Sequence, residues 1–244
     1  MAQQDLQEMI RQASRVVAFT GAGISAESGI PTYRGSDGVW NQYDPAKYAD
    51  VSYFFRDPSY YWSFFKDVRY KVLKEANPNE GHKALAELES QETLQAVVTQ
   101  NVDGLHQEAG SRKVLELHGN TRSFSCLSCG SSYSLDRVRD LLESELPPPC
   151  QECGGMLKPD VVMFGEALPQ DTLHQAWEQA QGCDLFLAIG SSLVVQPAAS
   201  LPAVAKQSGA RLVIVNKEET PLDSLADLII RDSASSALAG VLER

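Results

Sequence analysis

Four cysteines constrain the fold of this 244-residue chain more than any other feature of its sequence. Cys126 and Cys129 form one C-x2-C pair, and Cys150 and Cys153 form a second pair after twenty intervening residues. Four thiolates complete the tetrahedral shell of one Zn²⁺, and a closed shell leaves no position for water or substrate. We therefore predict one structural zinc per chain and expect the chemistry elsewhere.

Composition excludes several classes of protein. The length allows one full core with a small satellite domain, or two small domains. A net charge of −11 disfavours nucleic-acid binding and suits a basic partner such as a lysine-rich peptide, although it also fits plain solubility. No stretch approaches the roughly 18 apolar residues of a membrane span, and the first residues do not resemble a signal peptide. We expect a cytoplasmic monomer, with Cys183 as inert packing.

Apolar stretches alternate with helical patterns along much of the chain. Such alternation is typical of a parallel sheet with helices on both faces. The zinc segment interrupts this pattern, so we interpret it as an insertion in an α/β domain. The predicted strands are 15–20, 96–99, 114–118, 184–190, 211–216 and 227–230, and the predicted helices include 81–88, 172–181 and 197–208.

A glycine-rich turn follows the first apolar stretch. Gly21, Gly23 and Ala26 match G-x-G-x-x-A, in which glycine lets the backbone approach a pyrophosphate and the helix N-terminus offers free N–H groups. The acidic residue that usually ends the second strand about 20 positions later is missing. Either the ribose is bound from elsewhere, or the protein is not a standard dehydrogenase.

Other loops are expected at the same edge of the sheet, because ligands of open α/β sheets bind at the carboxyl ends of the strands. Ser191, Ser192 and Asn216 lie in such loops, and each could be an ordinary helix cap. The convergence of five loops favours a ligand site for the set. These loops follow Thr20, Thr99, Leu117, Gly190 and Val215.

His118 is the one of four histidines that has a motif around it. A histidine whose pKa is near neutrality can take a proton from a sugar hydroxyl or hold it in place, although a structural role is the alternative at a strand end. We expect His106 to pack near its loop, and His82 and His174 to lie on helix surfaces. The aromatic residues of 37–79 should form both a small helical core and the wall of a cleft.

Seven short motifs accompany the four cysteines along the chain. They are GAGIS at 21–25, GIP at 29–31, YRG at 33–35, TQNVDGLH at 99–106, LHGN at 117–120, FGE at 164–166 and GSSL at 190–193. Together these motifs resemble the sirtuin family of NAD-dependent protein lysine deacylases, in its minimal prokaryotic form. They occur in the family's order and span nearly the whole chain.

The resemblance implies an α/β fold in which a Rossmann-like parallel-sheet domain carries an inserted zinc-ribbon small domain and a helical module. We assign residues 1–36, 80–120 and 159–244 to the NAD-binding domain, residues 37–79 to the helical module and residues 121–158 to the zinc-binding module. NAD and an acyl-lysine peptide would bind between these parts.

The resemblance also implies a reaction. The acetyl-lysine oxygen attacks the ribose C1′ of NAD, nicotinamide leaves, and the acetyl group ends on O-acetyl-ADP-ribose. His118, as general base on the ribose hydroxyl, and Asn101 are the implied catalytic residues.

The implied contacts fall into two sets. Those to the cofactor are Gly21, Ala22, Gly23, Ile30, Tyr33, Arg34, Gln100, Asn101, Val102, Asp103, Gly190, Ser191, Ser192, Asn216, Ser233 and Ala234. Those to the peptide, which would pair with 161–166 as an added strand, are Val161, Val162, Phe164, Gly165 and Val194.

The sequence departs from the family patterns in two respects. Tyr33 stands where phenylalanine is usual, and we expect a small effect because the aromatic face is kept. Family members that prefer succinyl-lysine carry Tyr-x-x-Arg in the helical module. Those positions are Phe65 and Val68 here, and Arg69 is one residue off. We therefore expect neutral acyl groups, acetyl first, while the aromatic lining leaves longer chains open.

Other readings of the same residues exist. The NAD pocket could serve protein ADP-ribosyl transfer, and the scaffold could serve as a desuccinylase or long-chain deacylase. A non-catalytic NAD-binding or zinc-scaffolded module is disfavoured by His118, Asn101 and Asp103 together. A zinc hydrolase is disfavoured because four cysteines close the metal site.

Overall fold

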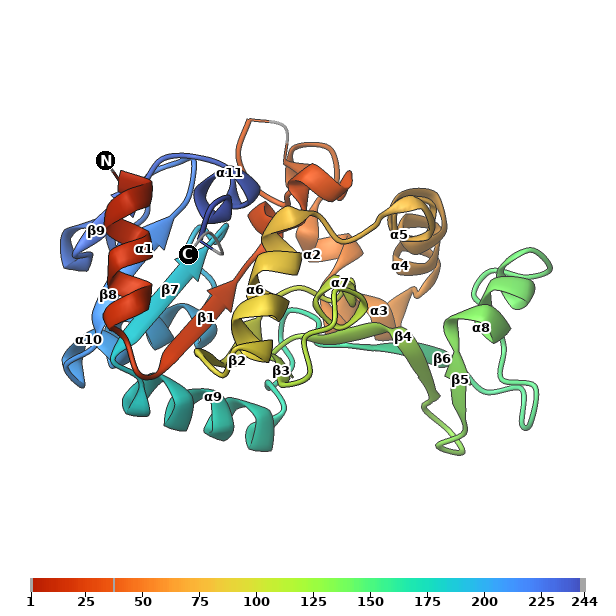
Figure 1. The fold of residues 1–244 in the computed structure, drawn as a ribbon. Coiled ribbons are helices and arrows are strands. Elements are labelled where there is room, and N and C mark those ends of the chain that lie inside the picture. Colours follow the sequence, from red (N-terminus) through yellow and green to blue (C-terminus); the bar gives the residue numbers. More distant parts are fainter. Residues whose placement is uncertain (1, 37, 242–244) are drawn as a thin grey trace.

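The computed structural model describes residues 2–36 and 38–241 (Figure 1). Asp37, Met1 and residues 242–244, which belong to the predicted domain ranges, lie outside the described residues. All six predicted strands are confirmed, with ends that differ by at most two residues. They form one parallel sheet that consists of β1 (Val16–Thr20), β2 (Leu94–Thr99), β3 (Val114–Glu116), β7 (Leu185–Ile189), β8 (Arg211–Val215) and β9 (Leu228–Ile230).

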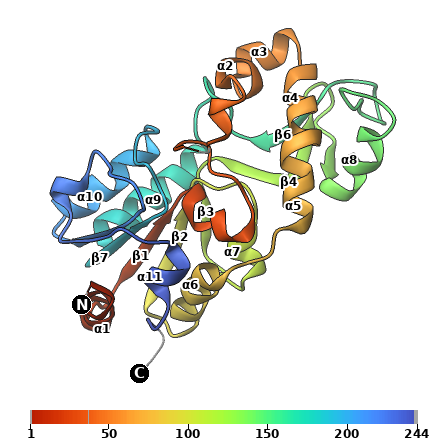
Figure 2. The ribbon, with the colours of Figure 1, turned by 90° about the horizontal axis from the view of Figure 1, so that it is seen from above.

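Helices cover both faces of this sheet (Figure 2). Side chains alternate between the faces, so that Val16 and Ala18 pack in one cluster while Val17 and Phe19 pack in the other. The first face is covered by α1 (Ala2–Gln12), α6 (Glu80–Ser90) and α11 (Ala234–Leu238), and the second by α9 (Gln170–Gly182) and α10 (Leu201–Gln207). Burial on both faces explains why the strands are continuous apolar runs.

The strand order of the large sheet is β3-β2-β1-β7-β8-β9. Counted within this sheet alone, the order is that of a doubly wound dinucleotide-binding fold. The direction of winding reverses between β1 and β7, and the crevice at such a reversal is where ligands bind.

A helical module follows β1 and the first glycine turn. It contains α2 (Pro45–Tyr48), α3 (Val51–Arg56), α4 (Ser59–Phe64), a π-helix (Phe65–Tyr70) and α5 (Lys71–Glu75). The Asp50 carboxylate caps α3 by accepting a hydrogen bond from the Tyr53 N–H. The i→i+5 hydrogen bonds of a π-helix accommodate an extra residue in an otherwise α-helical stretch.

The cysteine segment forms a second, antiparallel sheet with the order β5-β4-β6. Its elements are β4 (Gly119–Cys126), β5 (Ser132–Ser134), α8 (Leu135–Leu142) and β6 (Leu157–Val161). Phe54, Trp62 and Phe65 of the helical module share one buried cluster with Phe124 and Cys126 of this sheet. The two smaller parts of the molecule are therefore joined by a common core.

Short elements complete the chain. They are α7 (Leu105–Glu108) and the 3₁₀ helices Ala22–Ile24, Ala26–Ser28, Val39–Asn41, Ala198–Ser200 and Asp223–Leu225. The described part of the chain has no helix with the length and hydrophobicity that crossing a bilayer requires.

Candidate functional site

Two glycine turns pack backbone against backbone at the crevice between β1 and β7. The Gly21 N–H donates to the Ile189 carbonyl (3.0 Å), and the Gly23 N–H donates to the Gly190 carbonyl (2.8 Å). A Cβ on Gly23 would lie 2.7 Å from the Gly190 Cα, which is too close for any side chain. Glycine is therefore required here by packing, and the predicted nucleotide loop lies at the reversal point of the sheet.

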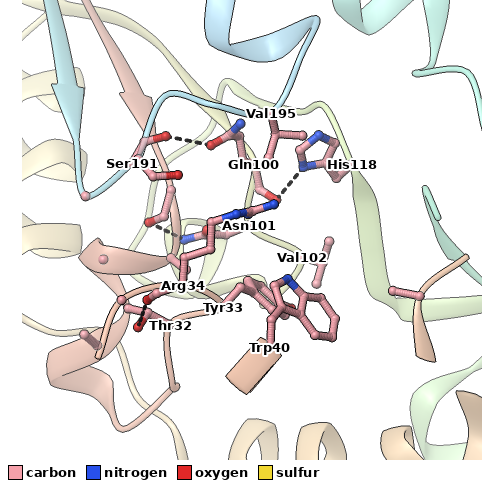
Figure 3. Close-up of a pocket in the computed structure, with 18 of the residues that line it drawn as sticks. Thr32, Tyr33, Arg34, Trp40, Gln100, Asn101, Val102, His118, Ser191 and Val195 are labelled. Atoms are coloured by element: carbon pink, nitrogen blue, oxygen red, sulfur yellow. Dashed lines mark hydrogen bonds between the residues drawn. The ribbon is translucent and has the colours of Figure 1, made fainter. Parts of the chain in front are cut away.

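A cavity of about 530 Å³ opens at this edge, a volume in the range of small-molecule sites (Figure 3). The predicted residues that line it are Gly21, Ala22, Gly23, Tyr33, Arg34, Gln100, Asn101, Val102, His118, Val161, Val162, Phe164, Gly165, Gly190, Ser191, Ser192, Asn216, Ser233 and Ala234. A second cavity of about 40 Å³ shares Ala22, Tyr33, Arg69, Asn101 and Val102 with it and adds the predicted residues Ile30 and Asp103.

His118 lies in the two-residue turn between β3 and β4 and lines the large cavity (Figure 3). Its Nδ1 lies 3.1 Å from the Gln100 carbonyl oxygen. Because a carbonyl can only accept, Nδ1 carries the proton and Nε2 keeps its lone pair. Burial lowers the pKa of His118, and the hydrogen bond to Gln100 opposes that shift. The ring is thus a neutral base in a fixed tautomer.

The Gln100 side chain joins the two halves of the cavity wall. The Ser191 hydroxyl, which follows β7, donates to Gln100 Oε1 (2.8 Å) (Figure 3). Ser191 is also buried. This contact fixes the loop after β2 against the loop after β7, beside the His118 ring.

Asn101 is oriented by buried partners beneath the cavity. Its Nδ2 donates to the Gly21 carbonyl (3.1 Å) and to Ser25 Oγ (3.1 Å). The Ser25 hydroxyl in turn donates to Asp103 Oδ2 (2.7 Å). Burial raises the pKa of Asp103. The amide of Asn101 is therefore held with its nitrogen toward the protein, which leaves Oδ1 as the acceptor for a ligand.

The prediction that His82 lies on a helix surface is wrong, because this residue is fully buried in α6. Its ring centroid lies 4.9 Å from that of His106, which packs near its loop as predicted. Burial lowers the pKa of His82 to about 4 and that of His106 to about 3, so both rings are neutral at neutral pH. The helical pattern of 81–88 could not reveal that α7 packs against this face. His174 is exposed, as predicted.

The four predicted metal ligands converge. The sulfurs of Cys126, Cys129, Cys150 and Cys153 lie within 4.8 Å of one another. The Cys126–Cys153 and Cys129–Cys150 sulfur distances are 3.6 and 3.7 Å. Zinc–sulfur bonds of about 2.3 Å place tetrahedral ligands roughly 3.8 Å apart, so the cluster fits one Zn²⁺. Cys183 lies elsewhere, buried under the sheet.

The predicted peptide strand is partly occupied by the protein itself. The Phe164 N–H donates to the Ala49 carbonyl (2.8 Å), and the Phe164 carbonyl accepts from the Val51 N–H (3.0 Å). Only part of 161–166 can therefore pair with a peptide. Val194 lines neither cavity and is 46% exposed, whereas its neighbour Val195 lines the large cavity.

Four residues of the helical module line the cavity although they are not among the predicted contacts: Trp40, Ala49, Tyr61 and Arg69. Trp40 and Tyr61 are among the aromatic residues expected to form the wall of a cleft, and Arg69 lies one residue off the Tyr-x-x-Arg pattern. The Arg69 guanidinium lies 5.4 to 5.9 Å from the ring centroids of Phe64, Tyr33 and Tyr61. It donates a weak hydrogen bond to the Tyr61 hydroxyl (3.4 Å) and forms no ion pair with an acidic side chain of the described residues. Burial raises the pKa of Tyr61 to about 12.

The π-helix gives a physical reason for the single-residue offset of Arg69 from the Tyr-x-x-Arg pattern. The extra residue within Phe65–Tyr70 changes the register of the helix, so Arg69 reaches the cavity although it is one position beyond the expected site. The one sequence signal that could have indicated this inserted residue was the offset of Arg69 from the Tyr-x-x-Arg pattern.

The fold and the site define a class of doubly wound α/β proteins that have a dinucleotide-sized cavity at the reversal point and a four-cysteine metal module. The chain belongs to the Sir2 family, which its sequence matches over residues 21–197.

Curated relatives match along almost their whole length. The NAD-dependent protein deacylase 2 of Archaeoglobus fulgidus is 48% identical over 238 residues, which cover 97% of this chain and 93% of the relative. The NAD-dependent protein deacetylase of Sulfolobus acidocaldarius is 50% identical and covers 96% of this chain and 92% of its own.

Solved structures show the same fold. A Sir2 protein with a deacetylated p53 peptide and 3′-O-acetyl ADP-ribose is 40% identical, with a TM-score of 0.95 and coverage of 100% of this chain and 98% of its own. A Sir2 structure with a p53 peptide and NAD⁺ is also 40% identical, with a TM-score of 0.91 and the same coverage.

Proposed function

We propose that this protein is an NAD-dependent protein lysine deacetylase, which transfers the acetyl group of acetyl-lysine to ADP-ribose and releases nicotinamide. The observation that carries this proposal is the neutral His118, with a free Nε2, in the wall of the cavity that the two glycine turns form. The names of the relatives and the ligands of the similar structures support it.

The proposed roles follow the position of each residue. His118 Nε2 takes the proton of a ribose hydroxyl, and Gln100 and Ser191 hold the wall beside it. Asn101 and Asp103 receive nicotinamide in the small cavity, which they line with Ile30. The peptide binds along 161–166, and the zinc only supports the fold.

The remaining proposals concern the whole protein. We keep the three-part division, a cytoplasmic location and a monomeric state, with acyl-lysine proteins as substrates and neither nucleic acid nor membrane as a partner. The charge of −11 disfavours nucleic acid, and reduced cysteines at metal spacing are typical of a reducing compartment.

The test is turnover of NAD by the purified protein with an acetyl-lysine peptide or its unmodified counterpart. Nicotinamide and O-acetyl-ADP-ribose are measured together. We expect equal amounts of both, and only with the acetyl-lysine peptide. Nicotinamide release without any acyl-lysine would instead indicate ADP-ribosyl transfer or NAD hydrolysis.

Arg69 favours a second candidate activity, the removal of an acidic acyl group such as succinyl. A buried guanidinium without a carboxylate partner is costly, and its Nε has no hydrogen-bond partner among the described residues. A carboxylate at the end of the acyl chain would supply that partner. This candidate competes with the preference for acetyl-lysine expected from Phe65 and Val68.

Replacement of Arg69 distinguishes the two acyl preferences. If Arg69 binds an acyl carboxylate, Arg69→Met lowers kcat/KM for a succinyl-lysine peptide by about 10- to 100-fold, the size of a lost charged hydrogen bond. Arg69→Lys keeps the charge and should lose less. An unchanged ratio of succinyl to acetyl turnover in Arg69→Met would remove this role.

A further inference from the structure

Lys158 contacts the segment 161–166, along which the substrate peptide is proposed to bind. It has no role in the steps of the proposed reaction. Its Nζ lies 3.0 Å from Glu166 Oε2 and donates to the carbonyls of Val161 (2.9 Å) and Pro159 (3.3 Å). The side chain is only 12% exposed. All three ammonium hydrogens therefore have acceptors, and two of these lie in 161–166.

Glu166 closes the same segment into a turn. Its Oε2 accepts a hydrogen bond from the Met163 N–H (2.8 Å), and its own N–H donates to the Met163 carbonyl (3.0 Å). Glu166 also lines the large cavity. One carboxylate thus joins Lys158, the turn and the cavity wall.

We propose that Lys158 is a positioning residue for the substrate peptide. It fixes 161–166 in the shape that accepts an added strand, and it neutralises Glu166 so that the cavity favours a neutral acyl-lysine over the cationic lysine product. This inference rests on the proposed function, because it takes the peptide to bind along 161–166.

We expect replacement of Lys158 to affect binding of the peptide and not binding of NAD. Without Lys158, the Val161 carbonyl loses a partner and Glu166 keeps an uncompensated charge, so the turn loses its support. The register of an added strand depends on the backbone groups of this segment. None of these interactions of Lys158 involves the glycine turns, which form another side of the cavity.

The test compares Lys158→Met with Lys158→Arg, which keeps the charge, and with Lys206→Met as a matched control. Lys206 forms a similar ion pair with Asp227 (2.6 Å), whose carboxylate also accepts a backbone N–H, from Leu212. KM is measured for the acetyl-lysine peptide and for NAD, together with inhibition by the unmodified lysine peptide.

For Lys158→Met we expect the peptide KM to rise about tenfold, as for one lost charged hydrogen bond, while kcat and the KM for NAD stay within about twofold. Preference should shift toward the lysine peptide. Lys158→Arg should recover most of the loss, and Lys206→Met should change none of these values. Glu166→Gln, which keeps the acceptor for Met163 but leaves Lys158 uncompensated, should shift preference the opposite way.

Two results would overturn the inference. One is an unchanged peptide KM in folded Lys158→Met, and the other is an equal rise in the KM for NAD, which would indicate general loss of structure. If Lys158→Met does not fold, a failure of Glu166→Gln to alter peptide preference overturns it in the same way. Absence of acetyl-peptide turnover by the wild-type protein would refute the proposed function itself. That result is distinct from the two that would overturn the role of Lys158.

Discussion

His118 combines a fixed tautomer with a lowered pKa, and a pH profile can test both. A general base acts in its neutral form, so activity is lost as pH falls through the pKa. Because burial lowers that pKa below 6.5, we expect kcat/KM for the acetyl-lysine peptide to stay level from pH 8 to about 6.5 and to fall only below it.

The matched variant is His118→Ala. It should lower turnover by roughly 10²–10⁴ and abolish this acid limb, while ADP-ribose binding measured by calorimetry stays near the wild-type value. If the residual activity of the variant shows the same fall at acid pH, the titration belongs to another group.

At the residue scale, sequence patterns predicted positions that a motif fixes and missed those that tertiary packing decides. Gly21, Gly23 and His118 follow strand ends, so their convergence could be predicted from the rule that ligands bind at the carboxyl edge of a parallel sheet. His82 is buried because α6 packs against segments distant in the sequence, among them α7, which carries His106. The lining of the cavity by Arg69 could not be predicted, because the sequence does not reveal that Phe65–Tyr70 forms a π-helix.

At the element scale, the two interlocked glycine turns support a further prediction. Gly190 and Gly29 both have positive φ, at 63° and 86°. A Cβ on Gly190 would lie 2.8 Å from the Gly23 Cα, whereas nothing lies within 4 Å of a Cβ on Gly29. Gly29→Ala should therefore lower stability by only about 1–2 kcal/mol, the usual cost of a left-handed residue. Gly190→Ala should separate the turns and weaken ADP-ribose binding by roughly 10²-fold or more.

Thermal unfolding and calorimetry with ADP-ribose measure the two effects separately. Equal losses of binding in Gly29→Ala and Gly190→Ala would show that backbone strain, and not the close approach of the turns, limits the site.

The same comparison shows what could be predicted at this scale. Central parallel strands are apolar on both faces, so β1, β7 and β8 stood out as uninterrupted runs. The short helices between 45 and 75 could not be separated in the sequence, because their aromatic residues serve both a core and a cavity wall. Tyr61 does both, since it belongs to the cluster shared with the cysteine sheet and also lines the cavity.

At the scale of the whole molecule, the metal module and the peptide side of the cavity share one hydrophobic core. Cys126 and Cys150 belong to the cluster that also contains Trp62, Val161 and Met163, and the last two line the cavity. The glycine turns lie against separate clusters under the large sheet. Loss of the metal should therefore weaken binding of the peptide before it weakens binding of the nucleotide.

Removal of zinc with a chelator, or Cys129→Ser, tests this order. We expect peptide binding to fall in proportion to zinc content, while ADP-ribose binding persists until the large sheet itself unfolds, because a metal that orders a small module contributes its binding energy to that module. Calorimetry with each ligand separately, beside a zinc assay, measures both. Cys183→Ser, which alters a buried thiol outside the metal cluster, should affect neither. Parallel loss of both ligands at the same zinc content would mean that the modules unfold as one cooperative unit, and full activity of folded, metal-free protein would refute a structural zinc.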